Sequence, residues 1–290
     1  MCGFVSVINS NLNKNFLFKK FQQIRGINKH RGPDDIKILS KDNYTVLFRR
    51  LKIIDLSNKA NQPFSILNGK ISLAFNGEIY NYLELKKDLK DLGYKFKTNS
   101  DTEVLIKSYL HWNLNFIEKI RGMFSIIIFD DIKKKIFFFR DHIGQKPIYY
   151  SRFNEGFIIS SEIKDILHLK KSFIENEKTV TKYLVRGWCD DDTSTFFKNI
   201  YSLPAGNFGI IEKKSIKIIK YWKLNISKNK KFLPDEFAEN FKNNLNLHLR
   251  SDVPLAFTLS GGLDSSSLLK NAMDQKSINY KAFSIKSSFK

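Results

Sequence analysis

Short apolar segments alternate with polar turns along residues 1–222 and predict a unit built largely of β-strands. Segments such as 124–129 are apolar on both strand faces, which is typical of sheets that are covered on both sides. The expected strands are Phe4–Ile8, Val46–Ile54, Ile71–Phe75, Met123–Asp130, Lys135–Arg140, Ile148–Arg152 and Phe157–Ser161, followed by a hairpin of Asn207–Ile211 and Ile216–Trp222.

Two helices are predicted among these strands. Four apolar residues spaced three or four apart over Tyr82–Leu92 share one helical face, and Gly93 is expected to end that helix. Ser100 and Glu103 have the spacing of a capping box, in which each side chain bonds the other residue's backbone. A second helix is therefore expected to begin after Ser100 and to end near His111.

The polar, lysine-rich stretch 224–233 predicts a linker between two domains, 1–222 and 233–290. The second domain is expected to have a helix at 234–250, a buried strand at 253–259, a helix at 267–274 and a strand at 280–285. This order is the β-loop-α-β opening of a parallel sheet. Its 58 residues fall below the usual ~100–200 of a domain, so we expect the domain to be incomplete.

Composition and charge narrow the function classes. The net charge of +20 favours anionic partners, but lysines are scattered through expected strands, helices and loops alike, so no specific nucleic-acid binding is predicted. No apolar run reaches the ~18–20 residues of a membrane span, and no signal-peptide pattern is present. The only cysteines, Cys2 and Cys189, fit neither a disulfide framework nor a metal site. A cytoplasmic protein with a chemically idle Cys189 is expected.

Cys2 directly follows the initiator methionine, which is readily removed before a small residue. The freed α-amine would have a pKa of about 7.7–8.0 and would lie beside the thiol of the same residue. An amine that accepts the thiol proton makes one residue both nucleophile and base. Taken by its position alone, a cysteine here is more often accidental, and the motifs below change that interpretation.

A second chemical motif, Ser260-Gly261-Gly262-Leu263-Asp264-Ser265-Ser266, stands between an expected strand and an expected helix. Glycines let the backbone approach an anion, and the helix N-terminus and serine hydroxyls add donors. The Gly-Lys-Ser/Thr ending of a Walker loop is absent. The motif resembles the pyrophosphate-binding loop of ATP pyrophosphatases; the structural alternative is a serine-rich helix cap.

Five further motifs occur in a fixed order between these two. They are His30-Arg31-Gly32-Pro33-Asp34, Arg50-Leu51-Lys52-Ile53-Ile54-Asp55, Asn76-Gly77-Glu78-Ile79-Tyr80-Asn81, Ser100-Asp101-Thr102-Glu103 and Arg140-Asp141-His142-Ile143-Gly144-Gln145-Lys146-Pro147. With Cys2 and the later loop, the whole chain resembles glutamine-hydrolysing asparagine synthetase. The resemblance implies a four-layer αββα sandwich of the N-terminal-nucleophile class, followed by the start of an α/β parallel-sheet ATP-pyrophosphatase domain.

The resemblance also implies a glutamine site. Asn76 and Gly77 would form an oxyanion hole, although Asn-Gly alone is a strong turn signal. Arg50 would fork onto the α-carboxylate, and Asp101 would hold the α-ammonium, although an acid in a first helical turn is favourable in any case. His30 and Arg31 are expected to be structural. The implied catalytic residues are Cys2, Asn76 and Gly77, and the implied glutamine pocket is Arg50, Leu51, Lys52, Ile53, Ile54, Asn76, Gly77, Glu78 and Asp101.

In the second domain the resemblance implies ATP, with Mg²⁺ on its phosphates, and aspartate as the acceptor that becomes asparagine. The implied ATP contacts are Leu259, Ser260, Gly261, Gly262, Asp264, Ser265, Ser266 and Ile285, and no metal site made by protein side chains alone is expected. Four alternatives stay open: an amidotransferase with another acceptor, a glutaminase-only fragment, a non-catalytic subunit and a basic nucleic-acid binder. A homodimer also stays open.

Overall fold

The computed structural model describes residues 2–226, 232–275 and 280–286. It divides the chain into two compact units, residues 1–52 with 57–224 and residues 53–56 with 225–290. We describe each unit by itself. The first contains the nucleophile candidate and most of the motifs, and the second contains the glycine-serine loop.

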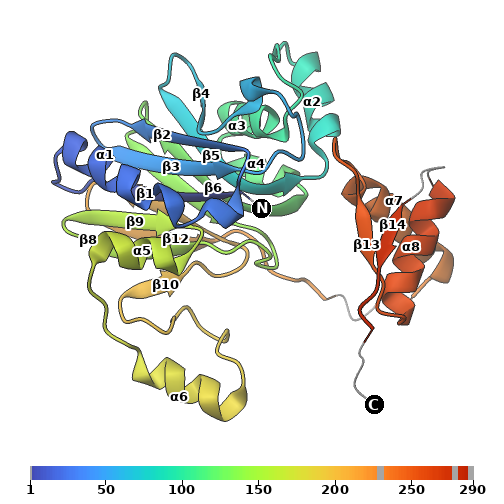
Figure 1. Cartoon of the computed structure of the whole chain (residues 1–290). Coiled ribbons are helices and arrows are strands. Elements are labelled where there is room, and N and C mark those ends of the chain that lie inside the picture. Colours follow the sequence, from blue (N-terminus) through green and yellow to red (C-terminus); the bar gives the residue numbers. More distant parts are fainter. Residues whose placement is uncertain (1, 227–231, 276–279, 287–290) are drawn as a thin grey trace. The chain divides into compact units, whose positions relative to one another are not determined.

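The first unit is a sandwich of two antiparallel sheets with helices on both outer faces (Figure 1). The first sheet runs β10 (Ile200–Ser202), β8 (Tyr149–Phe153), β9 (Gly156–Ser160), β1 (Gly3–Ile8), β3 (Tyr44–Arg50) and β2 (Asp35–Ser40). The second sheet runs β12 (Ser215–Lys220), β11 (Asn207–Glu212), β7 (Lys135–Arg140), β6 (Gly122–Asp130), β5 (Ile71–Ile79) and β4 (Phe64–Ile66).

Strand alternation explains why the sheets stack. In β1, Phe4 and Ile8 pack into the core between the sheets, whereas Val5 and Val7 pack into the core beneath the helices. Successive side chains of a strand point to opposite faces, so a strand that is apolar at every position is covered twice. The expected αββα layering is confirmed.

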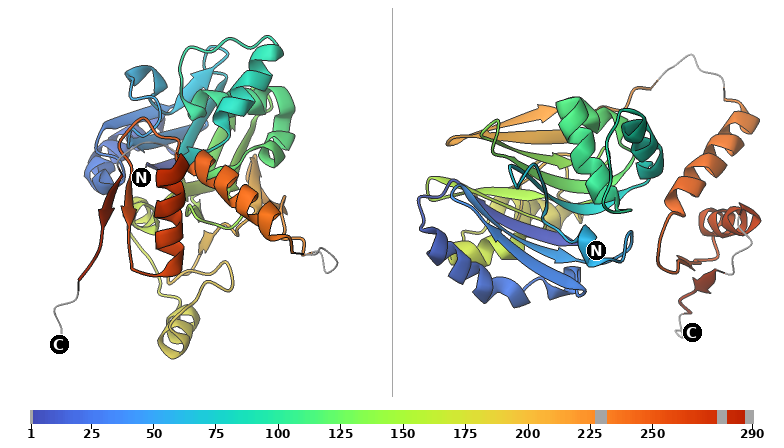
Figure 2. Two further views of the ribbon diagram at one scale, coloured as in Figure 1. Left: turned by 90° about the vertical axis from the view of Figure 1, so that its right-hand side faces the viewer. Right: turned by 90° about the horizontal axis from the view of Figure 1, so that it is seen from above.

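Helices cover each outer face (Figure 2). On the first sheet, α1 (Lys14–Gln23) and α5 (Ile163–Lys170) share a buried apolar cluster with β1 and β3. On the second sheet lie α2 (Tyr82–Asp91), α3 (Asp101–Trp112) and α4 (Phe116–Lys119). Tyr109 of α3 and Phe116 of α4 contact Phe137 and Phe139 of β7 with ring centroids 5.2–5.9 Å apart. A further helix, α6 (Glu177–Arg186), projects from the sandwich (Figure 1).

Most of the expected strands are confirmed to within a few residues, with two exceptions near the candidate site. The strand expected at Ile71–Phe75 continues to Ile79 and contains Asn76 and Gly77. The strand expected at Val46–Ile54 ends at Arg50, because the chain turns there to pass the start of β1. The sequence did not predict α1, α4, α5, α6, β2, β4 and β10. The three missed strands all lie at sheet edges. Two of them, β4 and β10, are only three residues long and are too short to show the apolar alternation that marks a strand. The third, β2, does alternate over Asp35–Ile38, and that signal was overlooked.

The second unit contains α7 (Pro234–His248), β13 (Ala256–Thr258), α8 (Leu263–Gln275) and β14 (Lys281–Phe283). The two strands pair in parallel, as predicted. The expectation of a buried strand at 253–259 is wrong: Ala256 and Thr258 are exposed, because this part of the chain buries only a small apolar cluster around Leu245, Leu249 and Ala272. The helix also begins at Leu263, earlier than expected. Among the described residues, no helix combines the length and apolarity that crossing a bilayer needs.

Candidate active site

Cys2 precedes β1 at the end of the sandwich where β3 also finishes. Its Sγ accepts a hydrogen bond from Leu51 N at 3.3 Å and lies 3.5 Å from Leu51 O. Burial raises the pKa of the Cys2 thiol above its usual range, and the charges of Asp101 and Arg50 also act on it. The thiol is therefore protonated near neutrality and requires a base to become a nucleophile.

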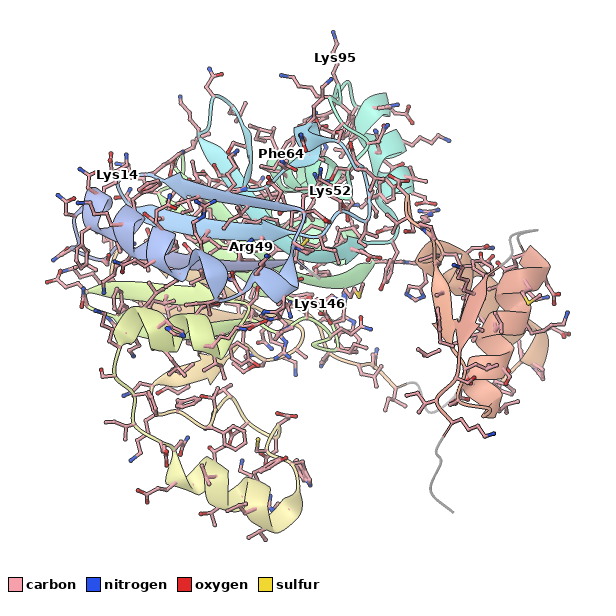
Figure 3. All side chains as sticks on the ribbon, viewed as in Figure 1. Lys14, Arg49, Lys52, Phe64, Lys95 and Lys146 are labelled. Atoms are coloured by element: carbon pink, nitrogen blue, oxygen red, sulfur yellow. The ribbon has the colours of Figure 1, made fainter. Side chains whose placement is uncertain are left out.

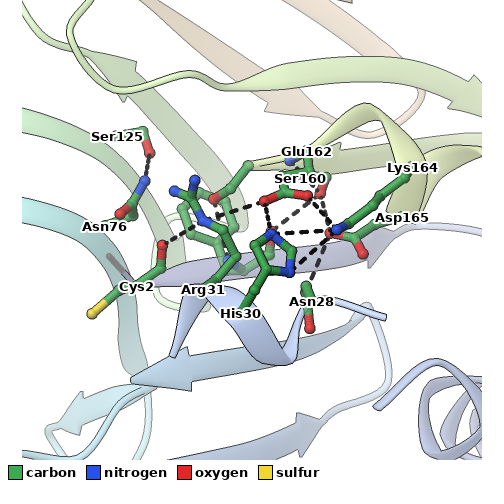
Figure 4. Close-up of polar contacts among 12 residues, drawn as sticks. Cys2, Asn28, His30, Arg31, Asn76, Ser125, Ser160, Glu162, Lys164 and Asp165 are labelled. Carbon is green, nitrogen blue, oxygen red and sulfur yellow. Dashed lines mark hydrogen bonds and ion pairs between the residues drawn. The ribbon is translucent and has the colours of Figure 1, made fainter. Parts of the chain in front are cut away.

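Two donors converge on the carbonyl oxygen of Cys2. Arg31 Nε donates to it at 3.0 Å (Figure 4). Asn76 Nδ2 donates to it at 2.8 Å when the amide is oriented with its oxygen toward Arg31 Nη2, at 3.1 Å. This orientation is required because a guanidinium only donates and a carbonyl only accepts. The amide atom that then faces Ser125 Oγ, 3.4 Å away, is the oxygen.

Gly77 has a backbone that only glycine accommodates. Its φ is +154°, and a Cβ would lie 2.0 Å from Met123 O and 2.8 Å from Phe124 Cα. Asn76 and Gly77 lie inside β5 opposite β6, so the alternative reading of Asn-Gly as a turn is wrong. The glycine lets β5 approach β6 closely at the position beside Cys2.

The N–H of Gly77 points to the edge of β5 that faces away from β6. Alternate residues of a strand direct their N–H groups to the same edge. On either side of Gly77, Phe75 N donates to Gln62 Oε1 at 2.6 Å, and Ile79 N donates to Asp101 Oδ2 at 3.1 Å. The Gly77 N–H therefore lies between Gln62 and Asp101, on the edge where the acidic group of the predicted pocket is held.

Asp101, the first residue of α3, is a buried acid with 5% of its surface exposed. Burial, together with the nearby charge of Glu78, raises its pKa to about 7 against the opposing hydrogen bond from Ile79 N. A carboxylate held this far out of water favours a cationic partner. This is the chemistry required of a group that binds an α-ammonium.

The capping of α3 differs from the predicted capping box. Ser100 Oγ accepts from Thr102 N at 3.0 Å, as a cap should. Glu103, however, accepts from Lys97 N and Thr98 N rather than from Ser100 N, which donates to Thr98 Oγ1 at 3.3 Å. Glu103 thus holds the segment before α3 through its hydrogen bonds to the backbone of residues 97 and 98, and Asp101 is fixed at the start of the helix.

Arg50 and its neighbour Arg49 lie on opposite faces of β3. The face of each shows which of the two arginines can reach the predicted glutamine pocket. Arg49 donates to Arg25 O on the side of α1. Arg50 lies on the face that turns toward the second sheet, where its neighbour Phe48 packs between the sheets. Arg50 is 3% exposed, and its Nη1 donates to Ser57 O at 2.8 Å and to Asn61 Oδ1 at 2.6 Å. Arg50 is accordingly the arginine on the side of Cys2.

The 30–34 motif packs against the 50–52 motif. A Cβ at Gly32 would lie 2.6 Å from backbone atoms of both Arg49 and Arg50, so glycine is needed for this approach. Asp34 N donates to Arg50 O at 3.1 Å, and Asp34 Oδ2 accepts from Lys52 N at 2.8 Å. These contacts hold Leu51 against the thiol. Ile53 and Ile54 belong to the second compact unit, so their places in the glutamine pocket stay predictions.

Lys146 is a site residue that the sequence reading did not select. It is only 5% exposed, and burial lowers the pKa of its ammonium while the charges of Glu78, Asp141 and Cys2 act to raise it. Its backbone N–H donates to Asp141 Oδ2 at 2.8 Å, which fixes the loop that carries it (side chain labelled in Figure 3). Burial in turn raises the pKa of Glu78. The sequence signal for this residue is the motif at 140–147, from which no role for the lysine was predicted.

The glycine-serine loop of the second unit brings most of the predicted ATP contacts together. Gly261 has a φ of +84°, and Gly262 N donates to Ser260 Oγ at 3.4 Å. Ser260 Oγ lies 3.1 Å from Ser265 Oγ, and Ser266 N donates to Gly262 O at 3.2 Å. These residues and Asp264 are at the exposed or half-buried N-terminal end of α8. Leu259 N donates to Phe283 O at 2.8 Å and extends the β13–β14 ladder.

Ile285 was expected at the end of the second strand but lies two residues beyond β14 and is fully exposed. Within the described ranges, no group of three or more His, Cys, Asp or Glu side chains could hold a metal ion. The loop offers Asp264 and serine hydroxyls to a cation that arrives with a phosphate ligand. That donor set suits Mg²⁺, which keeps several of its waters when it binds with a nucleotide.

Comparison with known proteins places the first unit in a family. A family model described as a glutamine amidotransferase domain matches residues 1–222, about three quarters of the chain. The chain belongs to this family. A second model, described as asparagine synthase, matches residues 236–289. The family predicted from the ordered motifs is thereby confirmed.

Two curated relatives illustrate the range of the amidotransferase family. The chain is 34% identical to asparagine synthetase (glutamine-hydrolyzing) 1 of Bacillus subtilis over 283 residues, which cover 94% of this chain and 44% of that protein. It is 36% identical to a protein of Gibberella zeae named as an amidase over 256 residues, which cover 82% of this chain and 36% of that protein. The chain thus spans less than half the length of either relative.

A solved structure supports the fold. Glutamine phosphoribosylpyrophosphate amidotransferase from Bacillus subtilis, in complex with ADP and GMP, superimposes with a TM-score of 0.55 at 17% identity. The match covers 78% of this chain and 50% of that one. The amidotransferase unit therefore has the predicted N-terminal-nucleophile fold.

Proposed function

We propose that the first unit hydrolyses glutamine to glutamate and ammonia with Cys2 as the nucleophile. The observation that carries the proposal is the convergence around Cys2: its carbonyl is held by Asn76, and the Gly77 N–H points to the edge where Asp101 is buried. Cys2, the proposed oxyanion donors and the buried acid Asp101 share one end of the sandwich, which supports the proposal. Membership of the glutamine amidotransferase domain family supports the same chemistry.

The steps follow from the groups available once Met1 is removed. The free α-amine of Cys2 takes the thiol proton, and the thiolate attacks the side-chain carbonyl carbon of glutamine. The oxyanion that forms is stabilised by the Asn76 amide and the Gly77 N–H, each worth about 3–4 kcal/mol in comparable sites. The amine returns its proton to the departing nitrogen, ammonia leaves, and a glutamyl thioester remains. Water, deprotonated by the same amine, then releases glutamate.

Glutamine is recognised through its two charged ends. Arg50 would bind the α-carboxylate and Asp101 the α-ammonium, with Leu51, Lys52 and Glu78 completing the pocket within the first unit. Arg50 already uses Nη1 to bond Ser57 O and Asn61 Oδ1, so its position is preset by the loop after β3. A preset guanidinium loses little freedom when the ligand binds.

The second unit, we propose, begins a synthetase site that uses this ammonia. ATP with Mg²⁺ would bind the loop at 259–266 and adenylate aspartate, and ammonia would displace AMP to give asparagine. The asparagine synthase match at 236–289 and the named Bacillus subtilis relative support this assignment. The Gibberella zeae relative named as an amidase favours a second candidate, an amidotransferase with a different acceptor. Product analysis with aspartate, glutamine and ATP separates the two. A cytoplasmic setting and a homodimer stay predictions.

The test of the hydrolase is direct labelling. Purified protein is treated with diazo-oxo-norleucine, a glutamine-mimicking electrophile, and the N-terminal peptide is analysed by mass spectrometry. We expect Met1 to be absent, Cys2 to carry the label and Cys2→Ala to release no ammonia from glutamine. Cys189→Ala is the matched control and should keep the wild-type rate, because Cys189 lies in the loop after α6. Hydrolysis at the normal rate by Cys2→Ala would end the proposal.

A further inference from the structure

A charged network reaches the nucleophile from a distant segment of the chain (Figure 4). Glu162, between β9 and α5, places Oε1 3.5 Å from Arg31 Nε and 2.7 Å from His30 Nε2. The Glu162 side chain is 20% exposed and that of Arg31 is 9% exposed, whereas His30 is 53% exposed. Lys164, 39% exposed, is a second outer member, with its Nζ 2.9 Å from Glu162 Oε2. Arg31 is the inner member: its Nε–H donates to Cys2 O, and Glu162 attracts it as an opposite charge at 3.5 Å.

Arg31 performs two tasks at the nucleophile. Its Nε donates to Cys2 O, and its Nη2 donates to the amide oxygen of Asn76. The second contact decides which way the amide points. With a donor-only group on one side, Asn76 turns its oxygen to Arg31 and its NH₂ toward Cys2, which is the orientation an oxyanion donor needs.

Gly3 leaves the space that this arrangement requires. A Cβ at Gly3 would lie 3.1 Å from both Cβ and Cγ of Arg31 and 3.3 Å from its Nε. The arginine therefore lies directly across the residue that follows the nucleophile. The neighbouring strand is fixed from the same segment, since Phe4 N donates to Ser161 Oγ at 3.2 Å and Ser161 N donates to Phe4 O at 2.9 Å.

We propose that Glu162 is a positioning residue for glutamine hydrolysis, acting through Arg31 to hold the Cys2 carbonyl and to orient the Asn76 amide. The inference rests on the proposed hydrolase. Glu162 touches neither the thiol nor the predicted glutamine contacts; it holds the guanidinium that touches both Cys2 and Asn76. Its loss should therefore lower the rate of the chemical step more than it weakens glutamine binding.

The experiment measures kcat and KM for glutamine hydrolysis in Glu162→Gln, together with the thermal midpoint from tryptophan fluorescence. We expect kcat to fall about tenfold while KM stays within twofold of wild type. Glu155→Gln is the matched control. Glu155 precedes the other end of the same strand, β9, and also forms an ion pair, with Lys214. It should leave both constants unchanged.

Two further variants make the result decisive. In an Arg31→Lys background, Glu162→Gln should cost less than a further twofold in kcat, because the group it acts through is already altered. Gly3→Ala, which presses on Arg31 and leaves Glu162 intact, should lower kcat even if Glu162→Gln fails to fold. An unchanged kcat in folded Glu162→Gln would overturn the inference. So would a loss of kcat on Glu162→Gln substitution that is equally large in the wild-type and the Arg31→Lys backgrounds. A wild-type protein without glutaminase activity would instead refute the proposed function.

Discussion

Asp101 connects stability to function, and its substitution gives the sharpest test of the site. Burial raises the pKa of this carboxyl to about 7 from an ordinary value of 3.8. Below pH 4 the group is protonated in both the folded and the unfolded chain. Between pH 4 and 7 the unfolded chain loses this proton while the folded chain keeps it, so the free energy of unfolding falls as the pH rises.

The size of the effect follows from the shift. Each pH unit in this window costs about 1.4 kcal/mol, so the two units from pH 5 to 7 cost about 3 kcal/mol, and the loss is complete by pH 8. Asn at position 101 keeps one acceptor oxygen for Ile79 N but has no proton to lose. Relative to wild type, Asp101→Asn should therefore gain about 3 kcal/mol in unfolding free energy between pH 5 and pH 8.

Urea unfolding followed by tryptophan fluorescence measures this difference. All three tryptophans, Trp112, Trp188 and Trp222, belong to the first compact unit, so the signal reports the unit that contains Asp101. Asp91→Asn, an exposed acid at the end of α2, is the control and should show no such pH dependence. The same Asp101→Asn variant should have a greatly raised KM for glutamine, because a neutral amide holds an ammonium group poorly. A difference between variant and wild type that stays constant from pH 5 to 8 would refute the reasoning.

Two other substitutions test neighbouring groups. Gly77→Ala should lower the unfolding free energy by about 2–4 kcal/mol, since its Cβ would meet the backbone of β6. In the same urea assay the control Gly26→Ala, where a Cβ meets nothing within 4 Å, should change the unfolding free energy by less than about 1 kcal/mol. Equal effects of the two substitutions would contradict the steric argument. Lys146→Met should lower kcat/KM for glutamine about tenfold, because a buried positive charge beside Glu78 and Cys2 is lost. Lys146→Arg, which keeps the charge, should retain most of the wild-type kcat/KM. An unchanged kcat/KM in Lys146→Met would exclude an electrostatic role for this lysine.

The parts of the fold that could be predicted are those whose signal is local. Strands such as β6 and β7 are apolar at nearly every position and were placed within one residue. The parallel β13–α8–β14 unit followed from an apolar run, a glycine-serine loop and a helical stretch in sequence. The bounds failed where neighbours decide them: β3 stops at Arg50 because Leu51 must turn to meet the Cys2 thiol.

The candidate site divides in the same way. Cys2, Asn76 and Asp101 belong to recognisable motifs, although motif spacing cannot show that they share one end of a sandwich. Lys146 and Glu162 come to the site through strand pairing and burial, which a single sequence does not display. Arg49 and Arg50 cannot be distinguished by residue type. They differ only because alternate side chains of β3 point to opposite faces of the sheet.

The proposed nucleophile, Cys2 freed of Met1, would create a structural demand that accounts for this network. An interior residue is held by peptide bonds on both sides, whereas Cys2 without Met1 would be held covalently only through Gly3. Fixing a residue's backbone costs about 1–2 kcal/mol of conformational free energy, and non-covalent contacts must supply what the missing bond does not. Arg31 and Asn76 meet that demand at the Cys2 carbonyl, and Leu51 meets it at the thiol. Because Arg31 forms an ion pair with Glu162, part of the restraint on Cys2 comes from the segment between β9 and α5, some 160 residues away in the sequence.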